Sequence, residues 1–252
     1  MNQDKAYKLL ALQENISNNE AKALIDTGIV SARGKKVEIA RALMSVNTKF
    51  QLQKIQKATK IFENDEILAV NKPAFLTSQS VADEFKFELL NRLDKETSGV
   101  LLLAKTPEFR TKAIAEYKAM RVKKESIAVV NGIISDEMEI NEPILTLKSK
   151  SGAISKISKN GKEAITRVRP LMISGKKTLI LAEILTGRTH QIRVHLASLG
   201  HFIIGERKYA KSNAKRLFLH SYKTEILGLK FRAEIPREFG EFGFEISKNT
   251  DF

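Results

Sequence analysis

The sequence predicts an α+β fold, in which a mixed, largely antiparallel sheet follows a small N-terminal module of helix and hairpin. Two observations lead to this prediction. From Ile61 onward, short apolar runs recur between turn residues, as strands do, and helical periodicity is confined to a few segments. The segment Ile173–Lys177 joins two strand candidates too briefly for a crossover helix, so that pair must be antiparallel.

Residues 1–50 are predicted to form the N-terminal module, and residues 51–60, in a polar and basic stretch, a linker. Ser17 and Glu20 form a capping box at a helix start, and Gly28 stands where that helix would end. The turn that follows should project three cations, Arg33, Lys35 and Lys36.

Residues 61–252 are predicted to form the second domain, which carries the sheet. Strands are expected at Ile67–Val70, Val100–Ala104, Ile127–Val130, Ile165–Arg169, Leu179–Ile184, Phe218–Leu219 and Phe231–Ile235. A helix should begin at Pro107 after the cap Thr106, with an inner face of Phe109, Ala113, Tyr117 and Met120. A second helix is expected from about Arg188 to Leu199, ending at Gly200.

Composition excludes several classes of protein. The 252 residues include 42% hydrophobic and 29% charged side chains, as in a globular chain long enough for two domains. The sequence has no run of about 18 apolar residues and does not begin like a signal peptide, so we expect a cytoplasmic protein without a membrane partner. With no cysteine, disulfides, thiolate nucleophiles and cysteine-type metal sites are excluded.

The net charge of +14 indicates a polyanionic partner, either nucleic acid or an anionic membrane surface. Residues 1–60 hold 11 basic and 5 acidic side chains, and residues 146–177 hold 9 and 1, so these two stretches account for the whole excess. A single basic stretch is often only a solvated lysine face. Two basic stretches in an otherwise neutral chain favour nucleic acid.

Two polar segments could carry chemistry. Asn91–Gly99 precedes an apolar strand and contains Asp94, whose neighbouring cations would hold it ionised as a nucleophile or base. Gly187–Leu196 places several cations at a helix start. Each segment has an ordinary alternative, a turn for the first and a phosphate or solvent site for the second. His190 and His195 lie about 140° apart on a helix, so they present no shared metal face.

Together, NRLDKETSGVLLLAK and GRTHQIRVHLASLGHFIIGERKY closely resemble the signature segments of the RluA/RluD-type pseudouridine synthases. The opening strand around Ile67–Ala74 and the late strand around Arg216–Ser221 also match, so the resemblance covers roughly Ile61–Phe239. Residues 1–50 resemble the small S-four RNA-binding module. The resemblance implies the pseudouridine synthase fold and isomerisation of a uridine in RNA, a redox-neutral reaction without a metal or other cofactor.

The resemblance also implies roles for individual residues. Asp94 matches the catalytic aspartate that attacks the nucleoside at the sugar or at the ring, and Arg193 matches the arginine that pairs with it. Arg92 matches the residue that fills the place of the flipped base. Further candidate substrate-binding residues are Ser126, Arg188, His190 and Leu219, and candidate RNA-binding residues are Arg33, Lys35 and Lys36.

Three positions depart from the family pattern. Ser126 replaces a tyrosine whose ring stacks on the target uracil, Asn91 replaces a histidine, and Phe75 replaces a glycine. Phe75 is by size a candidate to supply the missing ring.

The sequence therefore predicts an RNA pseudouridine synthase, acting as a monomer on structured ribosomal RNA in preference to transfer RNA. A catalytically weak or silent relative that serves ribosome assembly, and a synthase of transfer RNA, remain open. A DNA-binding protein would fit the charge but would leave the segment around Asp94 unexplained.

Overall fold

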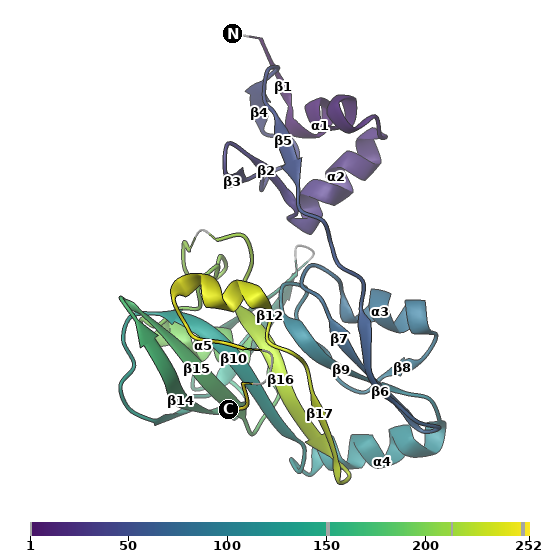
Figure 1. Cartoon of the computed structure of the whole chain (residues 1–252), viewed down its shortest axis with the longest axis vertical. Helices are drawn as coiled ribbons and strands as arrows, with labels where there is room; N and C mark the ends of the chain where they lie inside the picture. Colours follow the sequence, from purple (N-terminus) through teal and green to yellow (C-terminus); the bar gives the residue numbers. More distant parts are fainter. Residues whose placement is uncertain (1, 150–151, 213, 248–249) are drawn as a thin grey trace. The chain divides into compact units, whose positions relative to one another are not determined.

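The computed structural model describes residues 2–149, 152–212, 214–247 and 250–252, in two compact units, Met1–Gln56 and Lys57–Phe252 (Figure 1). The division lies inside the segment 51–60, which the sequence suggests as a linker. Strands occupy both ends of that segment, β5 (Phe50–Leu52) and β6 (Thr59–Glu63), so the predicted linker is too long. Both strands are short and mostly exposed, and for that reason the sequence shows no apolar period there.

The N-terminal unit combines two helices with short strands. Helix α2 begins at the predicted capping box of Ser17 and Glu20 and ends at Gly28, which has a φ of 82°. Arg33 and Gly34 both adopt positive φ in the turn between two paired strands, and Arg33 and Lys35 are exposed while Lys36 is half-buried. Besides β5, this unit contains β1 (Gln3–Lys5), α1 (Ala6–Glu14), α2 (Asn18–Thr27), β2 (Val30–Ala32), β3 (Lys35–Lys36) and β4 (Leu43–Ser45).

The second unit is built on one large sheet in the order β11-β14-β15-β10-β16-β9-β7-β6, with β17 beside β16 and β8 beside β9. Among the described pairings of this sheet, β9 and β16 are parallel and the others antiparallel, which confirms the predicted mixed, largely antiparallel α+β class. Its remaining strands are β7 (Ile67–Lys72), β8 (Glu88–Leu89), β9 (Ser98–Ala104), β10 (Lys123–Asn131), β11 (Met138–Asn141), β14 (Ile165–Ser174), β15 (Lys177–Ile184), β16 (Leu219–Ile226) and β17 (Leu229–Arg232).

The parallel junction between β9 and β16 requires a glycine. Gly99 has a φ of 115°, and a Cβ atom there would overlap the backbone of Ser221 on the facing strand. The two halves of the sheet therefore meet directly after the segment that carries Asp94, so the junction helps to fix that segment in place.

Helices cover both faces of the β7–β9 part of the sheet. Val81 and Ala82 of α3 (Ser78–Phe85) pack against one set of alternating strand residues, and Phe109 and Ala113 of α4 (Pro107–Lys118) pack against the other. Helix α5 (Gln191–Ser198) packs against the β10–β15 part, and the 3₁₀ helix η1 (Arg237–Phe242) follows the last strand.

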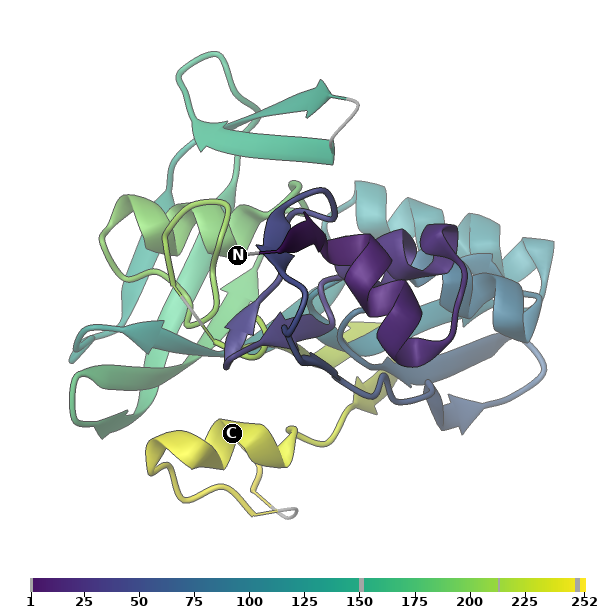
Figure 2. The ribbon, with the colours of Figure 1, turned by 90° about the horizontal axis from the view of Figure 1, so that it is seen from above.

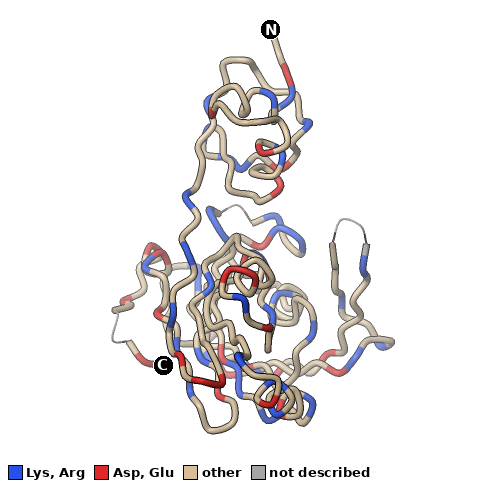
Figure 3. Tube along the Cα trace, turned by 90° about the vertical axis from the view of Figure 1, so that its right-hand side faces the viewer, with Lys and Arg blue, Asp and Glu red and all other residues tan. Residues whose placement is uncertain are grey.

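A separate hairpin of β12 (Ile144–Ser149) and β13 (Gly152–Ile157) extends away from the large sheet (Figure 2). The second basic stretch of the sequence is divided here between two regions, as the charged positions in Figure 3 show along the trace. Lys148, Lys156 and nearby lysines are exposed on the hairpin and the loop after it, whereas Arg167 and Arg169 belong to β14.

The predicted strands exist, but the bounds of each differ from those expected, and two of these differences have a clear local cause. The strand expected at Phe218–Leu219 continues to Ile226, because its later polar residues are buried in the sheet. The strand expected at Phe231–Ile235 ends at Arg232, since Pro236 and a 3₁₀ helix follow closely. The turn after Ile173 does join antiparallel strands.

Two details of the predicted helices are wrong. Met120 is 61% exposed because α4 ends at Lys118, so Met120 lies beyond the helix and outside its periodicity. The second helix begins at Gln191 instead of Arg188, because His190 adopts the left-handed conformation with a φ of 55°. The Thr106 cap and the Pro107 start are confirmed. None of the described helices is long and apolar enough to cross a membrane.

Candidate active site

A cavity of about 290 Å³ lies where the loop before β9, the start of α5 and the strands β10 and β16 meet. It brings together residues that are far apart in the sequence. All seven candidate catalytic and substrate-binding residues line it: Arg92, Asp94, Ser126, Arg188, His190, Arg193 and Leu219. Arg33, Lys35 and Lys36 belong to the N-terminal unit.

The loop that carries Asp94 is fastened from both sides. The Ser78 hydroxyl exchanges hydrogen bonds with the backbone of Leu93, at 2.9 and 3.0 Å. The side chain of Asn91 accepts a hydrogen bond from the backbone N–H of Leu102 on β9, at 2.8 Å. Asn91, a departure from the family pattern, thus binds the loop to the central strand, which helps to position Asp94.

Lys72 braces the other side of this loop, and sequence analysis did not identify it. Its buried ammonium group donates to the carbonyl oxygens of Pro73, Leu76 and Lys95, at 3.0, 2.9 and 3.4 Å. Burial lowers the pKa of Lys72 to about 7, and the charge of Arg216 acts in the same direction. A Lys-Pro pair at the end of a strand gives no sequence signal for such a role.

Arg193 connects Asp94 to the protein interior. Its guanidinium is 2% exposed and donates from Nη1 to Asp94 Oδ2 at 2.9 Å. It also binds Glu206 with two nitrogens, at 2.6 Å to Oε2 and 2.9 Å to Oε1. This bidentate contact fixes the plane of the guanidinium, so that one nitrogen is held toward Asp94.

Glu206 is fully buried and has no predicted role from the sequence. Burial alone would raise the pKa of its carboxyl group, but Arg193 and the backbone N–H groups of Lys208 and Tyr209 lower it below its ordinary value. Burial likewise disfavours a charged Arg193, yet Glu206 and Asp94 outweigh this and raise its pKa overall. Two sequence signals point to Glu206: it lies within the segment GRTHQIRVHLASLGHFIIGERKY, and it is the only acidic residue between Glu183 and Glu225.

His190 faces Asp94 as a neutral ring. Burial lowers the pKa of His190 below its ordinary value near 6.5, although the charge of Asp94 acts in the opposite direction. The Tyr209 hydroxyl lies 2.6 Å from His190 Nδ1 and accepts from the backbone N–H of Ser155 at 2.9 Å. The other ring nitrogen of His190, Nε2, lies 3.7 Å from Asp94 Oδ2.

Gln191 shapes the loop that leads into α5 and is a third residue, after Lys72 and Glu206, that sequence analysis did not identify. Its buried side-chain oxygen accepts from the backbone N–H of Arg188 and from the Thr186 hydroxyl. Its amide nitrogen donates to the Ile165 carbonyl on β14 at 2.9 Å. Arg188 itself donates to the Glu163 carbonyl at 2.7 Å, so this loop is attached to β14 and to the segment before it.

Ser126 is buried on β10 and leaves the cavity without a large side chain at that position. Phe75 does not replace it, because Phe75 is buried elsewhere and is not among the residues that line the cavity. Its φ of 73° suits the glycine expected there. Beside Ser126 on the same strand face, burial lowers the pKa of Lys124 to about 8.

His195 has a structural role, since its ring nitrogens lie 2.9 Å from the Thr166 hydroxyl and the Glu142 carbonyl. Within the part of the chain that the structure describes, no group of three His, Asp or Glu side chains could hold a metal ion.

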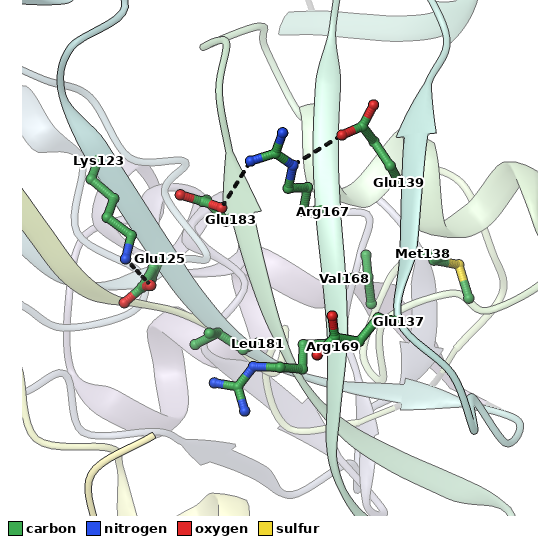
Figure 4. A pocket seen from close by; sticks show the side chains of 10 residues that line it. All are labelled: Lys123, Glu125, Glu137, Met138, Glu139, Arg167, Val168, Arg169, Leu181 and Glu183. Carbon is green, nitrogen blue, oxygen red and sulfur yellow. Dashed lines mark hydrogen bonds and ion pairs between the residues drawn. The ribbon is translucent and has the colours of Figure 1, made fainter.

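A second, larger hollow of about 530 Å³ lies on the sheet over β10, β11, β14 and β15 (Figure 4). It is also rich in charge, but five of its seven charged side chains pair with one another near the surface. Arg167 contacts Glu139 at 2.9 Å and Glu183 at 3.8 Å, and Lys123 contacts Glu125 at 2.9 Å. None of the predicted site residues lines this hollow.

Comparison with known proteins identifies the family of this chain. The family model described as RNA pseudouridylate synthase matches residues 65–198. An uncharacterized RNA pseudouridine synthase of Helicobacter pylori strain J99 is 53% identical over 94% of this chain and 99% of its own length.

More distant proteins match about three quarters of the chain. A ribosomal large subunit pseudouridine synthase C of Rickettsia bellii is 36% identical over 74% of this chain and 69% of its own. The structure of human RNA pseudouridylate synthase domain containing 1 is similar over 74% of this chain and 86% of its own, with a TM-score of 0.64 and 25% identity. The chain therefore belongs to the RNA pseudouridylate synthase family and is an RNA-modifying isomerase.

Proposed function

We propose that the protein converts specific uridines to pseudouridine in structured ribosomal RNA, with Asp94 as nucleophile and Arg193 as its partner. One observation carries this proposal. Asp94 lines the cavity and contacts a buried arginine that Glu206 holds in place. Burial of a charged group costs free energy. The buried guanidinium of Arg193 therefore indicates that its orientation toward Asp94 is important for function.

The reaction requires three changes at the target nucleoside. The bond from N1 to the ribose C1′ breaks, a bond from C5 to C1′ forms, and the proton on C5 leaves while N1 gains one. Because the base lies stacked in RNA, it must first be flipped into the cavity, and exposed Arg92 at the cavity wall is suited to fill the vacated space. Asp94 then attacks the sugar or the ring, and the bond that it forms breaks again before the product leaves, which returns the free carboxylate without a metal or other cofactor.

Ribosomal RNA is the favoured substrate for two reasons. The Rickettsia bellii relative is named as a synthase of the ribosomal large subunit. The N-terminal unit holds nine basic and five acidic side chains, and we propose that it is an S-four-like RNA-binding module that uses Arg33, Lys35 and Lys36. We further propose that the enzyme acts as a cytoplasmic monomer.

Mapping of pseudouridine in RNA from cells with the gene deleted tests this function. We expect a site missing from ribosomal RNA that returns when wild-type protein is supplied and does not return with Asp94→Asn. A site missing from transfer RNA would overturn the choice of substrate. An unchanged pattern in both RNAs would favour the second candidate, a silent RNA-binding assembly factor, for which Ser126 is the main argument.

The RNA-binding role of the N-terminal unit can be tested in the full chain. Arg33→Gln combined with Lys35→Gln should weaken RNA binding and reduce the salt slope of log K by roughly 0.7–0.9 for each phosphate that is no longer neutralised. Lys112→Gln with Lys118→Gln on α4 is the control of equal charge. An equal effect of both pairs would show that the N-terminal cations act only through net charge, and competition by duplex DNA would indicate a general nucleic-acid binder.

A further inference from the structure

Three residues that line the cavity around Asp94 each have a buried hydroxyl group without a hydrogen-bond partner. The hydroxyl groups are Thr97 Oγ1, Tyr117 OH and Thr224 Oγ1. Among the described residues, these are all the buried side-chain nitrogen and oxygen atoms that lack a partner. They come from three separate elements, the loop before β9, helix α4 and strand β16. Because buried polar groups are normally paired, their meeting at one cavity indicates a polar ligand there.

Tyr117 also brings an aromatic ring to this cavity. His190 is the other aromatic ring among the described lining residues, but Tyr209 contacts that ring edge-on, with 5.7 Å between the centroids. Lys124 Nζ lies 5.8 Å from the centroid of the Tyr117 ring, so the ring is next to the strand face that also carries Ser126. A serine at position 126 leaves room for a flat ligand beside Tyr117.

We propose that Tyr117 contacts the flipped uracil and that its ring is the surface on which the base stacks. The hydroxyl groups of Tyr117, Thr97 and Thr224 then lie along the polar edge of the base. Tyr117 would thus supply from helix α4 the ring that Ser126 does not supply from β10. This inference deepens the proposed function and rests on it for the identity of the ligand.

The chemistry of uracil fits this arrangement. The base presents two carbonyl oxygens and one N–H group, and a hydroxyl can donate or accept. Burial raises the pKa of Tyr117, so its hydroxyl stays protonated at neutral pH and serves as a donor to a carbonyl oxygen. Tyr117 therefore acts in binding the base.

Single-turnover kinetics on large-subunit ribosomal RNA from gene-deleted cells test this role. Because base–aromatic stacking would be removed, Tyr117→Leu should slow the reaction roughly 5- to 150-fold. Tyr117→Phe keeps the ring and should slow it by a smaller factor, roughly 2- to 10-fold. Tyr222→Phe is the control, since its hydroxyl bonds to Thr250 and Asp251 away from the cavity. A wild-type rate for Tyr117→Leu would overturn the inference.

A rescue experiment separates base contact from a packing role, because the Tyr117 ring also packs against the α4 core. Ser126→Tyr in the Tyr117→Leu background should restore most of the wild-type rate if the missing feature is an aromatic face. Thermal unfolding of each variant identifies loss of folded protein. A rate that stays low in the folded double variant would count against the stacking role.

Photocrosslinking tests the contact independently of turnover. The RNA is transcribed with 4-thiouridine in place of uridine, bound to the wild-type protein and irradiated. We expect a crosslink to the α4 peptide that contains Tyr117. Crosslinks confined to other peptides would overturn the inference. If the wild-type protein modifies neither ribosomal nor transfer RNA, the proposed function fails, whereas the crosslink still decides whether a base reaches Tyr117.

Discussion

Acidic and basic side chains gather both in the cavity around Asp94 and in the hollow over β11, β14, β15 and β10. The two regions differ in volume and in the burial of their ion pairs. The hollow is the larger, about 530 against 290 Å³. Its ion pair between Arg167 and Glu139 is 54% and 46% exposed, whereas Arg193 and Glu206 are 2% and 0% exposed. Exposed pairs exchange readily with water, and buried pairs hold a fixed geometry.

The comparison teaches that size and charge do not identify the site. In the cavity, the buried pair of Arg193 and Glu206 supports Asp94. Three of the residues that line the cavity have hydroxyl groups without a partner. In the hollow, described charges such as Lys123 and Glu125 pair with each other on the sheet surface. Variants that affect the two regions differently therefore test this distinction.

The largest difference is expected in turnover. Asp94→Asn should abolish isomerisation and leave RNA affinity nearly unchanged, because the amide keeps the shape but is not a nucleophile. Glu183→Gln in the hollow makes the same chemical change and should retain the wild-type rate. The measurement is pseudouridine formed in single-turnover assays. Comparable losses in both variants would mean that the hollow also belongs to the active site.

The next difference concerns stability. Glu206→Ala leaves Arg193 with a buried charge that is only partly compensated, and it should lower the free energy of unfolding by about 3–5 kcal/mol. Urea denaturation measures this change. Glu206→Gln keeps the shape and should lose less stability but still impair turnover through Arg193. A loss below about 1 kcal/mol for Glu206→Ala would contradict the buried-pair interpretation.

The stability of the folded protein should depend on pH through His220, which is buried next to the cavity. Burial lowers the pKa of His220 to about 3, from an ordinary value near 6.5, and the charge of Arg216 adds to this. Between these values the unfolded chain binds a proton that the folded chain does not, so stability should fall as the pH drops from about 6.5 to 3. NMR titration of the histidine ring protons checks this, and a His220 midpoint near 6.5 would refute it.

The smallest effect is expected for the surface pair. Arg167→Ala should change the free energy of unfolding by no more than about 1 kcal/mol, because Arg167, Glu139 and Glu183 are partly solvated. Urea denaturation at low and high salt measures it, and high salt should reduce the difference further. A loss as large as that of Glu206→Ala would remove the contrast between the two regions.

The sequence by itself determined where a helix starts when the capping contacts are made between neighbouring residues. The capping box of Ser17 and Glu20 and the Thr106–Pro107 start are satisfied by contacts within a few residues, so they could be predicted. The apolar strands were also predictable, because full burial requires continuous hydrophobic runs, as in β9. Helix α1 was missed, since the sequence around it offers no side-chain cap.

The resemblance placed Asp94 and Arg193, but only the tertiary structure decided what holds them. Glu206 and Tyr117 reach the site from a loop and from another helix, and no periodic pattern encodes such contacts. The tertiary structure likewise excluded Phe75 as the replacement ring. The physical reason is that burial and orientation belong to the packed chain, because they depend on residues brought together across the sheet junction, where Gly99 allows β9 and β16 to approach.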